Sequence, residues 1–212
     1  MPSLPESLPG SILDVVPVLP VVVIDSLDHA VPVARALVAG GLPAIELTLR
    51  TPVALDAIKA IAAEVPEILV GAGTIVTPAQ AQQAADAGAS FLVSPGATPS
   101  LLTAMRDTGL PFLPGTATVS EVLAALEAGC TELKFFPAEA SGGATFLQSV
   151  ASPVPAARFC PTGGITIASA PTYLALTNVG CVGGSWITPA DALAAGDWDR
   201  VTRLAAEAAA LR

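Results

Sequence analysis

The chain has 212 residues, of which 52% are hydrophobic and 13% charged, and its net charge is −9. The hydrophobic content excludes intrinsic disorder, and an acidic chain with no basic cluster does not fit a nucleic-acid-binding protein. A charged fraction below the average of roughly 25% indicates either that part of the surface is buried in an oligomer or that the core is large.

A membrane or secreted location is not expected. The longest strongly apolar run, residues 15–24, contains two prolines and is too short to span a bilayer. No basic segment of a signal peptide opens the chain. Cys130, Cys160 and Cys181 have no CxxC spacing, and the chain has one histidine, which argues against a zinc site. Buried thiols in a reducing cytoplasm are the simplest interpretation.

Short apolar runs alternate with Ala- and Leu-rich stretches along the chain. A helix is predicted at about residues 3–13, before the first strand. The apolar runs predict eight strands, at residues 17–24, 44–49, 67–73, 91–96, 111–115, 132–137, 157–164 and 179–185. The stretches between them predict helices, for example at residues 29–41, 51–65, 77–89, 98–109 and 118–130. Several of these begin with Thr or Ser and several end on Gly, as helices do.

This alternation indicates an α/β fold of parallel βαβ units. Eight units predict a (β/α)8 TIM barrel with an N-terminal helix, formed by residues 1–212 as a single domain. The alternative is an open doubly wound sheet, although the first strand-to-helix turn has no GxGxxG. Pro17 and Pro20 are unusual in a buried strand, so the limits of the first strand stay open.

Polar and flexible residues gather at the carboxyl ends of the predicted strands, where barrel enzymes carry their chemistry. In the second strand, Glu46, Thr48 and Arg50 alternate and therefore share one face. A carboxylate pointing into a barrel costs free energy unless it is paired or functional. The alternative is a buried Glu46–Arg50 pair that only ties strands together.

Lys134 lies in an apolar strand, between Leu133 and Phe135. It is one of two lysines, and the other, Lys59, falls in a helical stretch where a surface position is expected. Burial disfavours the charged ammonium, and a neutral amine is a nucleophile that forms Schiff bases with carbonyl carbons. The alternative is a structural bridge to Glu46. His29 is expected to face solvent, which leaves Glu46 as the proton carrier.

Two glycine pairs follow the seventh and eighth strands, in "PTGGI" and "VGGSW". Glycines let backbone N–H groups approach an anion, and the loops after these two strands are the usual phosphate site of this barrel. Thr162 and Ser185 could add hydroxyl donors. Each pair alone could equally serve a tight turn.

The segments "VAGGLPAIELTLRTP", "FLVSPG", "LKFFPAEASGG", "RFCPTGGI" and "CVGGSWITPADALAAGDWDR" together resemble the bacterial 2-keto-3-deoxy-6-phosphogluconate (KDPG) aldolases, which also act on 4-hydroxy-2-oxoglutarate (KHG). The resemblance extends from about Pro17 to the C-terminus. It implies a class I aldolase on a (β/α)8 barrel, a homotrimer, and no metal or other cofactor. It also implies a cytoplasmic enzyme of the Entner–Doudoroff pathway that binds neither nucleic acid nor membrane.

The resemblance also implies roles for single residues. Lys134 would form the Schiff base and Glu46 would be the general acid and base. The remaining positions would be Arg50 and Thr74 for the pyruvate carboxylate, Thr162, Pro95 and Phe136 for the walls, and Gly163, Gly164, Gly184 and Ser185 for the phosphate. Ala97, Thr116 and Ala117 depart from the family pattern, so the resemblance speaks to reaction type more than to substrate preference.

The activity implied is cleavage of KDPG to pyruvate and glyceraldehyde 3-phosphate, and of KHG to pyruvate and glyoxylate. Two alternatives stay open. One is a phosphosugar isomerase or epimerase with Glu46 as the enolisation base and Lys134 as a cationic electrophile. The other is a redesigned, aldolase-derived subunit of a larger protein assembly. The low surface charge favours this second alternative.

Overall fold

The computed structural model describes residues 10–211. The helix expected at residues 3–13 lies almost wholly outside this range. Within it, the chain opens with a short 3-10 turn, η1 (Ile12–Asp14), which Ser11 caps by accepting a hydrogen bond from the Leu13 N–H. Among the described residues, no helix is long and apolar enough to cross a membrane.

Strands form at all eight predicted positions, and all of their pairings are parallel. They are β1 (Val18–Val22), β2 (Ala44–Thr48), β3 (Leu69–Gly73), β4 (Phe91–Val93), β5 (Phe112–Leu113), β6 (Gly115–Thr116), β7 (Glu132–Phe135), β8 (Arg158–Pro161) and β9 (Val182–Gly184). The fifth predicted strand is divided into β5 and β6 by Pro114, which has no N–H to donate to a ladder.

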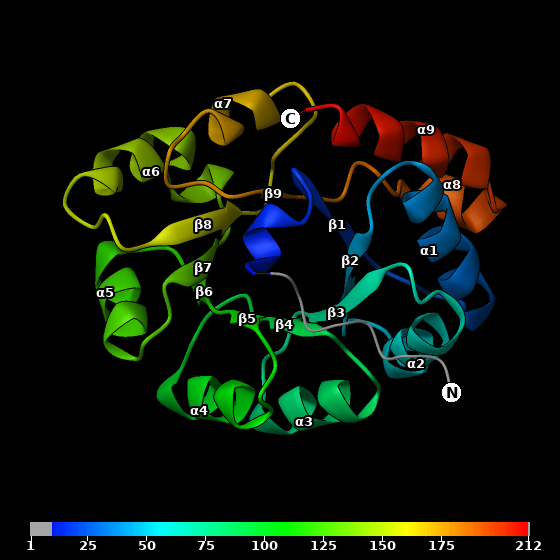
Figure 1. Ribbon diagram of the computed structural model, residues 1–212, viewed down its shortest axis with the longest axis horizontal. Helices are drawn as coiled ribbons and strands as arrows, with labels where there is room; N and C mark the ends of the chain where they lie inside the picture. The colour runs from blue at the N-terminus through cyan, green and yellow to red at the C-terminus, as the bar shows by residue number, and fades with distance from the viewer. Residues whose placement is uncertain (1–9, 212) are drawn as a thin grey trace.

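The strands form a six-stranded sheet, β5-β4-β3-β2-β1-β9, and a three-stranded sheet, β6-β7-β8. A single eight-stranded ladder was expected, and the division at Pro114 is one reason for the difference. Two isolated parallel bridges, Phe159 to Val179 and Thr162 to Gly183, link β8 to the β9 region. The larger sheet runs through consecutive strands and then joins the first to the last, unlike the order of a doubly wound sheet (Figure 1).

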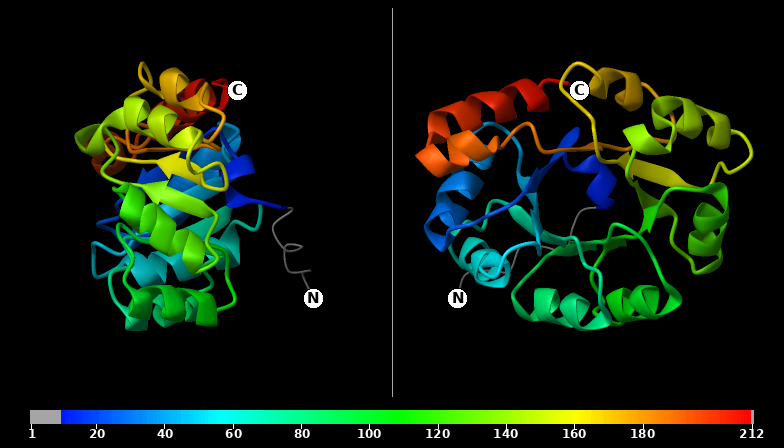
Figure 2. Two further views of the ribbon diagram at one scale, coloured as in Figure 1. Left: turned by 90° about the vertical axis from the view of Figure 1, so that its left-hand side faces the viewer. Right: turned by 180° about the vertical axis from the view of Figure 1, so that it is seen from behind.

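Helices lie outside the strands in the views of Figures 1 and 2. They are η2 (Leu27–His29), α1 (Ala30–Ala39), α2 (Ala54–Glu64), α3 (Pro78–Asp86), α4 (Pro99–Asp107), α5 (Val119–Glu127), η3 (Glu139–Ser141), α6 (Gly143–Ala151), α7 (Ala170–Leu174), α8 (Ala190–Ala195) and α9 (Trp198–Ala209). The helices predicted between the strands are confirmed, and Thr77 and Thr118 form capping boxes at the starts of α3 and α5.

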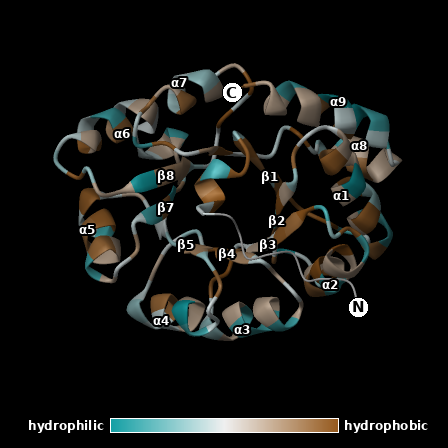
Figure 3. Ribbon diagram, in the orientation of Figure 1, coloured by the Kyte–Doolittle hydropathy of each residue, from teal (hydrophilic) through white to brown (hydrophobic). Residues whose placement is uncertain are grey.

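The strands are buried almost throughout, as expected for a parallel sheet covered by helices. Figure 3 shows β1 and β2 largely hydrophobic, whereas the helices alternate between hydrophobic and hydrophilic residues. Pro20 lies inside β1, opposite Gly184, and the carbonyl of Pro17 accepts a hydrogen bond of 3.0 Å from the Val182 N–H. Cys130, Cys160 and Cys181 are buried, as predicted, and none of them forms a disulfide within residues 10–211.

Candidate active site

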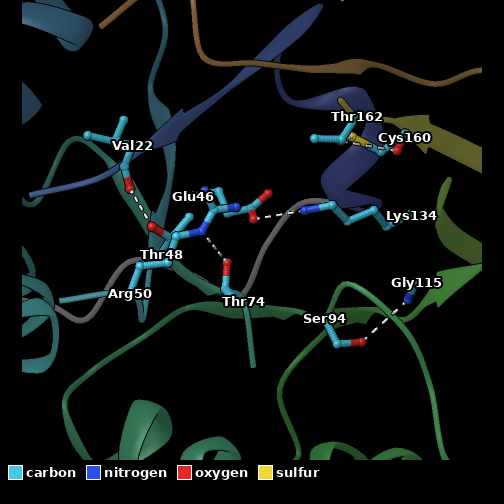
Figure 4. A network of polar contacts seen from close by, with 10 residues as sticks. All are labelled: Val22, Glu46, Thr48, Arg50, Thr74, Ser94, Gly115, Lys134, Cys160 and Thr162. Carbon is cyan, nitrogen blue, oxygen red and sulfur yellow. Dashed lines mark hydrogen bonds and ion pairs between the residues drawn. The ribbon is translucent and has the colours of Figure 1, made fainter. Parts of the chain in front are cut away.

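Lys134 and Glu46 form a buried ion pair between β7 and β2 (Figure 4). The Lys134 Nζ lies 3.1 Å from the Glu46 Oε1, although the two residues are 88 positions apart in the chain. Lys134 is 3% exposed and Glu46 1%. Since a buried ion pair adds little to stability over apolar residues of similar size, this pair is poorly explained as a structural device.

The second carboxylate oxygen of Glu46 has no hydrogen-bond partner among the described residues. A buried oxygen left unpaired costs free energy, so this atom is ready to accept a proton or a hydrogen bond. Gly73, at the end of β3, leaves space for the Glu46 carboxylate. A Cβ on Gly73 would overlap the Glu46 side chain, which explains a glycine at this strand end.

The apolar neighbours of Lys134 in the sequence do not surround its amine. Leu133 and Phe135 are fully buried on the opposite face of β7, because side chains alternate along a strand. The ring of Phe136 is the exception, with its centroid 5.3 Å from the Lys134 Nζ. The backbone carbonyl of Lys134 accepts a hydrogen bond of 3.3 Å from the hydroxyl of Thr116 on β6.

Arg50 and Thr74 meet at the same rim. The Arg50 Nε donates to the Thr74 Oγ1 at 3.2 Å, and the Arg50 guanidinium is otherwise exposed. Thr74 has a φ of 59°, a left-handed conformation that is rare for a β-branched residue. Thr48 donates to the Val22 carbonyl at 3.1 Å. Of the two pairings considered for Glu46, the structure has the one with Lys134 and not the one with Arg50.

A cavity of about 260 Å³ opens at the carboxyl ends of the strands. It is lined by Val21, Val23, Arg50, Phe136, Thr162, Gly163, Gly164, Ile165, Gly183 and Ser185. Six of the predicted site residues are in this set. Gly163 and Gly164 have φ values of 104° and 81°, which favour glycine.

Other predicted positions lie outside that lining. Gly184 packs against the indole of Trp186, while Gly183 faces the cavity, close to the Thr162 side chain. Pro95 is half-buried, and its backbone packs against Gly115.

A larger cavity of about 590 Å³ shares Val21, Val23 and Ser185 with the first. Its polar lining includes Asp25 and His29, which sequence reasoning did not assign to a site. His29 was expected to face solvent; it is half-buried and packs edge-on against Trp198, with ring centroids 5.6 Å apart. The sequence signal that could have pointed to this region is the alternation of Val21, in β1, with Val23, just beyond its end.

A buried amine beside a buried carboxylate, next to a cavity at the carboxyl ends of parallel strands, is the arrangement of an α/β enzyme that works through a lysine nucleophile. The chain belongs to the KDPG and KHG aldolase family, whose model matches residues 10–204. The family resemblance seen in the sequence is therefore confirmed, and the protein is an aldehyde-lyase.

Relatives and solved structures agree with this assignment. The KHG/KDPG aldolase of Escherichia coli K12 is 56% identical over 198 residues, which cover 93% of each chain. The 2-dehydro-3-deoxy-phosphogluconate aldolase of Dickeya dadantii is 54% identical, over 94% of this chain and 93% of its own. A Legionella pneumophila KDPG aldolase, with pyruvate captured at low pH as a covalent carbinolamine intermediate, superimposes with a TM-score of 0.91 at 44% identity, covering 93% and 96%. The Zymomonas mobilis ZM4 enzyme, solved with 3-phosphoglycerate, gives 0.89 at 48%, covering 94% of each.

Proposed function

We propose that the protein cleaves KDPG to pyruvate and glyceraldehyde 3-phosphate, and KHG to pyruvate and glyoxylate, through a Schiff base on Lys134. The observation that carries this proposal is the buried contact of 3.1 Å between the Lys134 Nζ and the Glu46 Oε1. It supplies a nucleophile and a proton carrier in one hydrogen bond, and the family membership of the chain supports the same reaction.

The first half of the reaction forms the imine. Glu46 accepts a proton from the Lys134 ammonium, and the freed amine attacks the C2 carbonyl carbon of the substrate. The attacking nitrogen passes a proton to the carbonyl oxygen to give a carbinolamine. The protonated Glu46 then gives its proton to that hydroxyl, which leaves as water, so that a protonated imine and the Glu46 carboxylate remain. The buried position of the pair keeps bulk water from competing for these protons.

The second half breaks the C3–C4 bond. The positive imine nitrogen accepts the bonding electrons, while Glu46, directly or through a water molecule, removes the proton of the C4 hydroxyl. The aldehyde product leaves, and Glu46 returns the proton to C3 of the remaining enamine. Hydrolysis of the imine then frees pyruvate and Lys134. The unpaired Oε2 of Glu46 is the oxygen available for this exchange.

The rest of the site binds the two ends of the substrate. Arg50, held by Thr74, pairs with the pyruvate carboxylate, since a guanidinium binds carboxylates in a bidentate manner. Thr162, Pro95 and Phe136 form walls of the pyruvate pocket. Gly163, Gly164 and Ser185, which line the cavity of about 260 Å³, receive the phosphate, together with Gly184, which lies beside that lining between Gly183 and Ser185.

We further infer that residues 1–212 form one (β/α)8 barrel domain, in which β5 and β6 act as a single strand and the bridges from β8 close the ring.

A homotrimer in the cytoplasm is the proposed oligomeric state and location. Self-association would cover some of the exposed large apolar side chains, which among the described residues are Leu27, Val76, Val119, Leu123 and Ile167. Light scattering should give a mass near three chains; a much larger mass would favour a subunit of a bigger assembly.

Borohydride trapping tests the chemistry. The protein is incubated with pyruvate and sodium borohydride, and the reduced adduct is located by peptide mass spectrometry. We expect a reduced pyruvyl adduct on Lys134. The Lys59→Ala variant should trap as the wild type does, and the Lys134→Ala variant should not trap. An unmodified Lys134 would exclude the Schiff base, and proton exchange without an adduct would indicate an isomerase or epimerase instead.

A further inference from the structure

A buried tyrosine lies behind the glycine loop that follows β8, and the proposed mechanism does not use it. Tyr173, on α7, is 2% exposed. Its hydroxyl donates a hydrogen bond of 2.6 Å to the Glu139 Oε1, across 34 residues of chain. Glu139 opens η3, the turn that follows the Lys134 strand, and is itself exposed.

The tyrosine hydroxyl is fixed from two directions. It sits against the start of α6, where a Cβ built on Gly143 would lie 3.1 Å from it. Burial, and then the hydrogen bond and charge of Glu139, raise the pKa of Tyr173 well above its usual range. The hydroxyl therefore keeps its proton at neutral pH and acts as a constant donor to the carboxylate.

The glycine loop rests directly on Glu139. The backbone N–H of Glu139 donates to the Gly163 carbonyl at 3.1 Å, and that of Ala138 donates to the Thr162 carbonyl at 2.8 Å. The side chain continues the contact, because a Cβ on Gly164 would come within 2.7 Å of the Glu139 Cγ. Backbone and side chain of one residue thus support both glycines that line the cavity.

We propose that the Tyr173–Glu139 hydrogen bond positions the Gly163–Gly164 loop and thereby sets the preference for phosphorylated substrates. This rests on the proposed function, in which the loop binds the phosphate. Backbone N–H groups bind an anion well only when the loop holds them in the right direction. The bond also anchors a negative charge beside the phosphate site, and a freed Glu139 carboxylate would repel the phosphate.

The test compares two reactions of the same protein. Cleavage of KDPG needs the phosphate end of the cavity, whereas deuterium exchange at C3 of pyruvate needs only the imine and Glu46. For the Tyr173→Phe variant we expect the KM for KDPG to rise about tenfold, the size of effect expected when a hydrogen bond to a charged group is lost. The inhibition constant of inorganic phosphate should rise similarly. The kcat and the pyruvate exchange rate should stay within about twofold of the wild type.

Two Glu139 variants separate the hydrogen bond from the charge. Glu139→Gln keeps an acceptor for the tyrosine and should keep the wild-type KM for KDPG or lower it. Glu139→Ala removes the acceptor and the packing under Gly164, but it also removes the negative charge that repels the phosphate, so the KM should rise about fivefold, less than in Tyr173→Phe. Because Glu139 is exposed, these variants decide the matter even if Tyr173→Phe does not fold. Thr202→Val removes a remote hydroxyl that bonds the Ala36 carbonyl and is the matched control.

The outcomes are distinct. An equal loss of KDPG cleavage and pyruvate exchange in Tyr173→Phe would overturn the inference, because it would indicate general damage. So would an unchanged KM for KDPG in Glu139→Ala. A wild-type protein that neither exchanges pyruvate protons nor cleaves KDPG would instead refute the proposed function itself.

Discussion

The two ends of the candidate active site are built from different kinds of chemical group. At the lysine end, two charged side chains from strands, Lys134 and Glu46, meet where both are at most 3% exposed. At the glycine end, the cavity is lined by main chain at Gly163 and Gly164 and by the exposed Ser185. Strands fix the first end, and loops that follow strands form the second.

The difference matches what each end is proposed to do. A nucleophile and its proton carrier must be held within a few tenths of an ångström and away from water. A phosphate is large and fully charged, and backbone N–H groups bind it without any titrating side chain. Substitutions at the lysine end should therefore lower kcat for every substrate, whereas those at the glycine end should raise the KM for phosphorylated substrates alone.

The largest effect should come from Glu46→Gln. The amide keeps the shape of the side chain but cannot carry a proton, so kcat for KDPG should fall about 10³-fold. Pyruvate deuterium exchange should fall to the same extent. Borohydride should still trap pyruvate on Lys134 over longer times, because the amine remains. A variant with more than a tenth of the wild-type kcat would show that another group carries the proton.

Gly73→Ala should impair catalysis at the lysine end of the site indirectly. The added Cβ would overlap the Glu46 carboxylate, which must then shift away from Lys134. A displacement of this kind is expected to lower kcat about 10²-fold, with a smaller change in KM. Gly96→Ala is the control, since a Cβ at Gly96 meets nothing within 4 Å. Equal activities of the two variants would contradict the prediction.

Ser185→Ala examines the glycine end. Ser185 lines the cavity, and the loss of its hydroxyl should raise the KM for KDPG about tenfold, the effect of one hydrogen bond to a charged group. The rate of pyruvate exchange should not change. Ser149→Ala removes a hydroxyl on α6 that bonds the Thr145 carbonyl, and it should leave both measurements as in the wild type. A loss of pyruvate exchange in Ser185→Ala would mean that the two ends are not independent.

The sequence predicted the lysine end well, because its signals are local. A lysine in an apolar strand is rare, and the strand period places its side chain opposite that of Leu133. The sequence left the pairing of Glu46 open between Arg50 and Lys134, and the 3.1 Å contact shows that it is with Lys134. The eight strand positions were predictable for the same reason, since each is a short apolar run and most are ended by Gly, Pro, Ser or Thr.

Features that depend on three-dimensional packing could not be predicted in this way. Pro114 was a local sign of a break in the run at 111–115, but whether a proline divides a strand or lies within it, as Pro20 does in β1, depends on the neighbouring strands. Whether Gly183 or Gly184 faces the cavity depends on how the Trp186 indole packs. Tyr173 carried no signal, because its partner Glu139 lies in an exposed turn on another element.

The smallest effect should come from Thr74→Gly, which separates stability from binding. A left-handed φ of 59° costs a threonine roughly 1–2 kcal/mol. Glycine removes this strain but loses about 0.5–1 kcal/mol through its freer unfolded chain, so a net gain of about 0.5 kcal/mol in unfolding free energy is expected. Urea denaturation measures this gain.

In the same variant the Arg50 Nε loses its acceptor, and the KM for pyruvate in the exchange assay should rise about threefold. Thr74→Ser keeps the hydroxyl and should keep the KM. Equal binding of pyruvate by both variants would show that the strained threonine does not position Arg50. Weaker binding in Thr74→Gly alone would show that the strained backbone serves to place the Thr74 hydroxyl at Arg50.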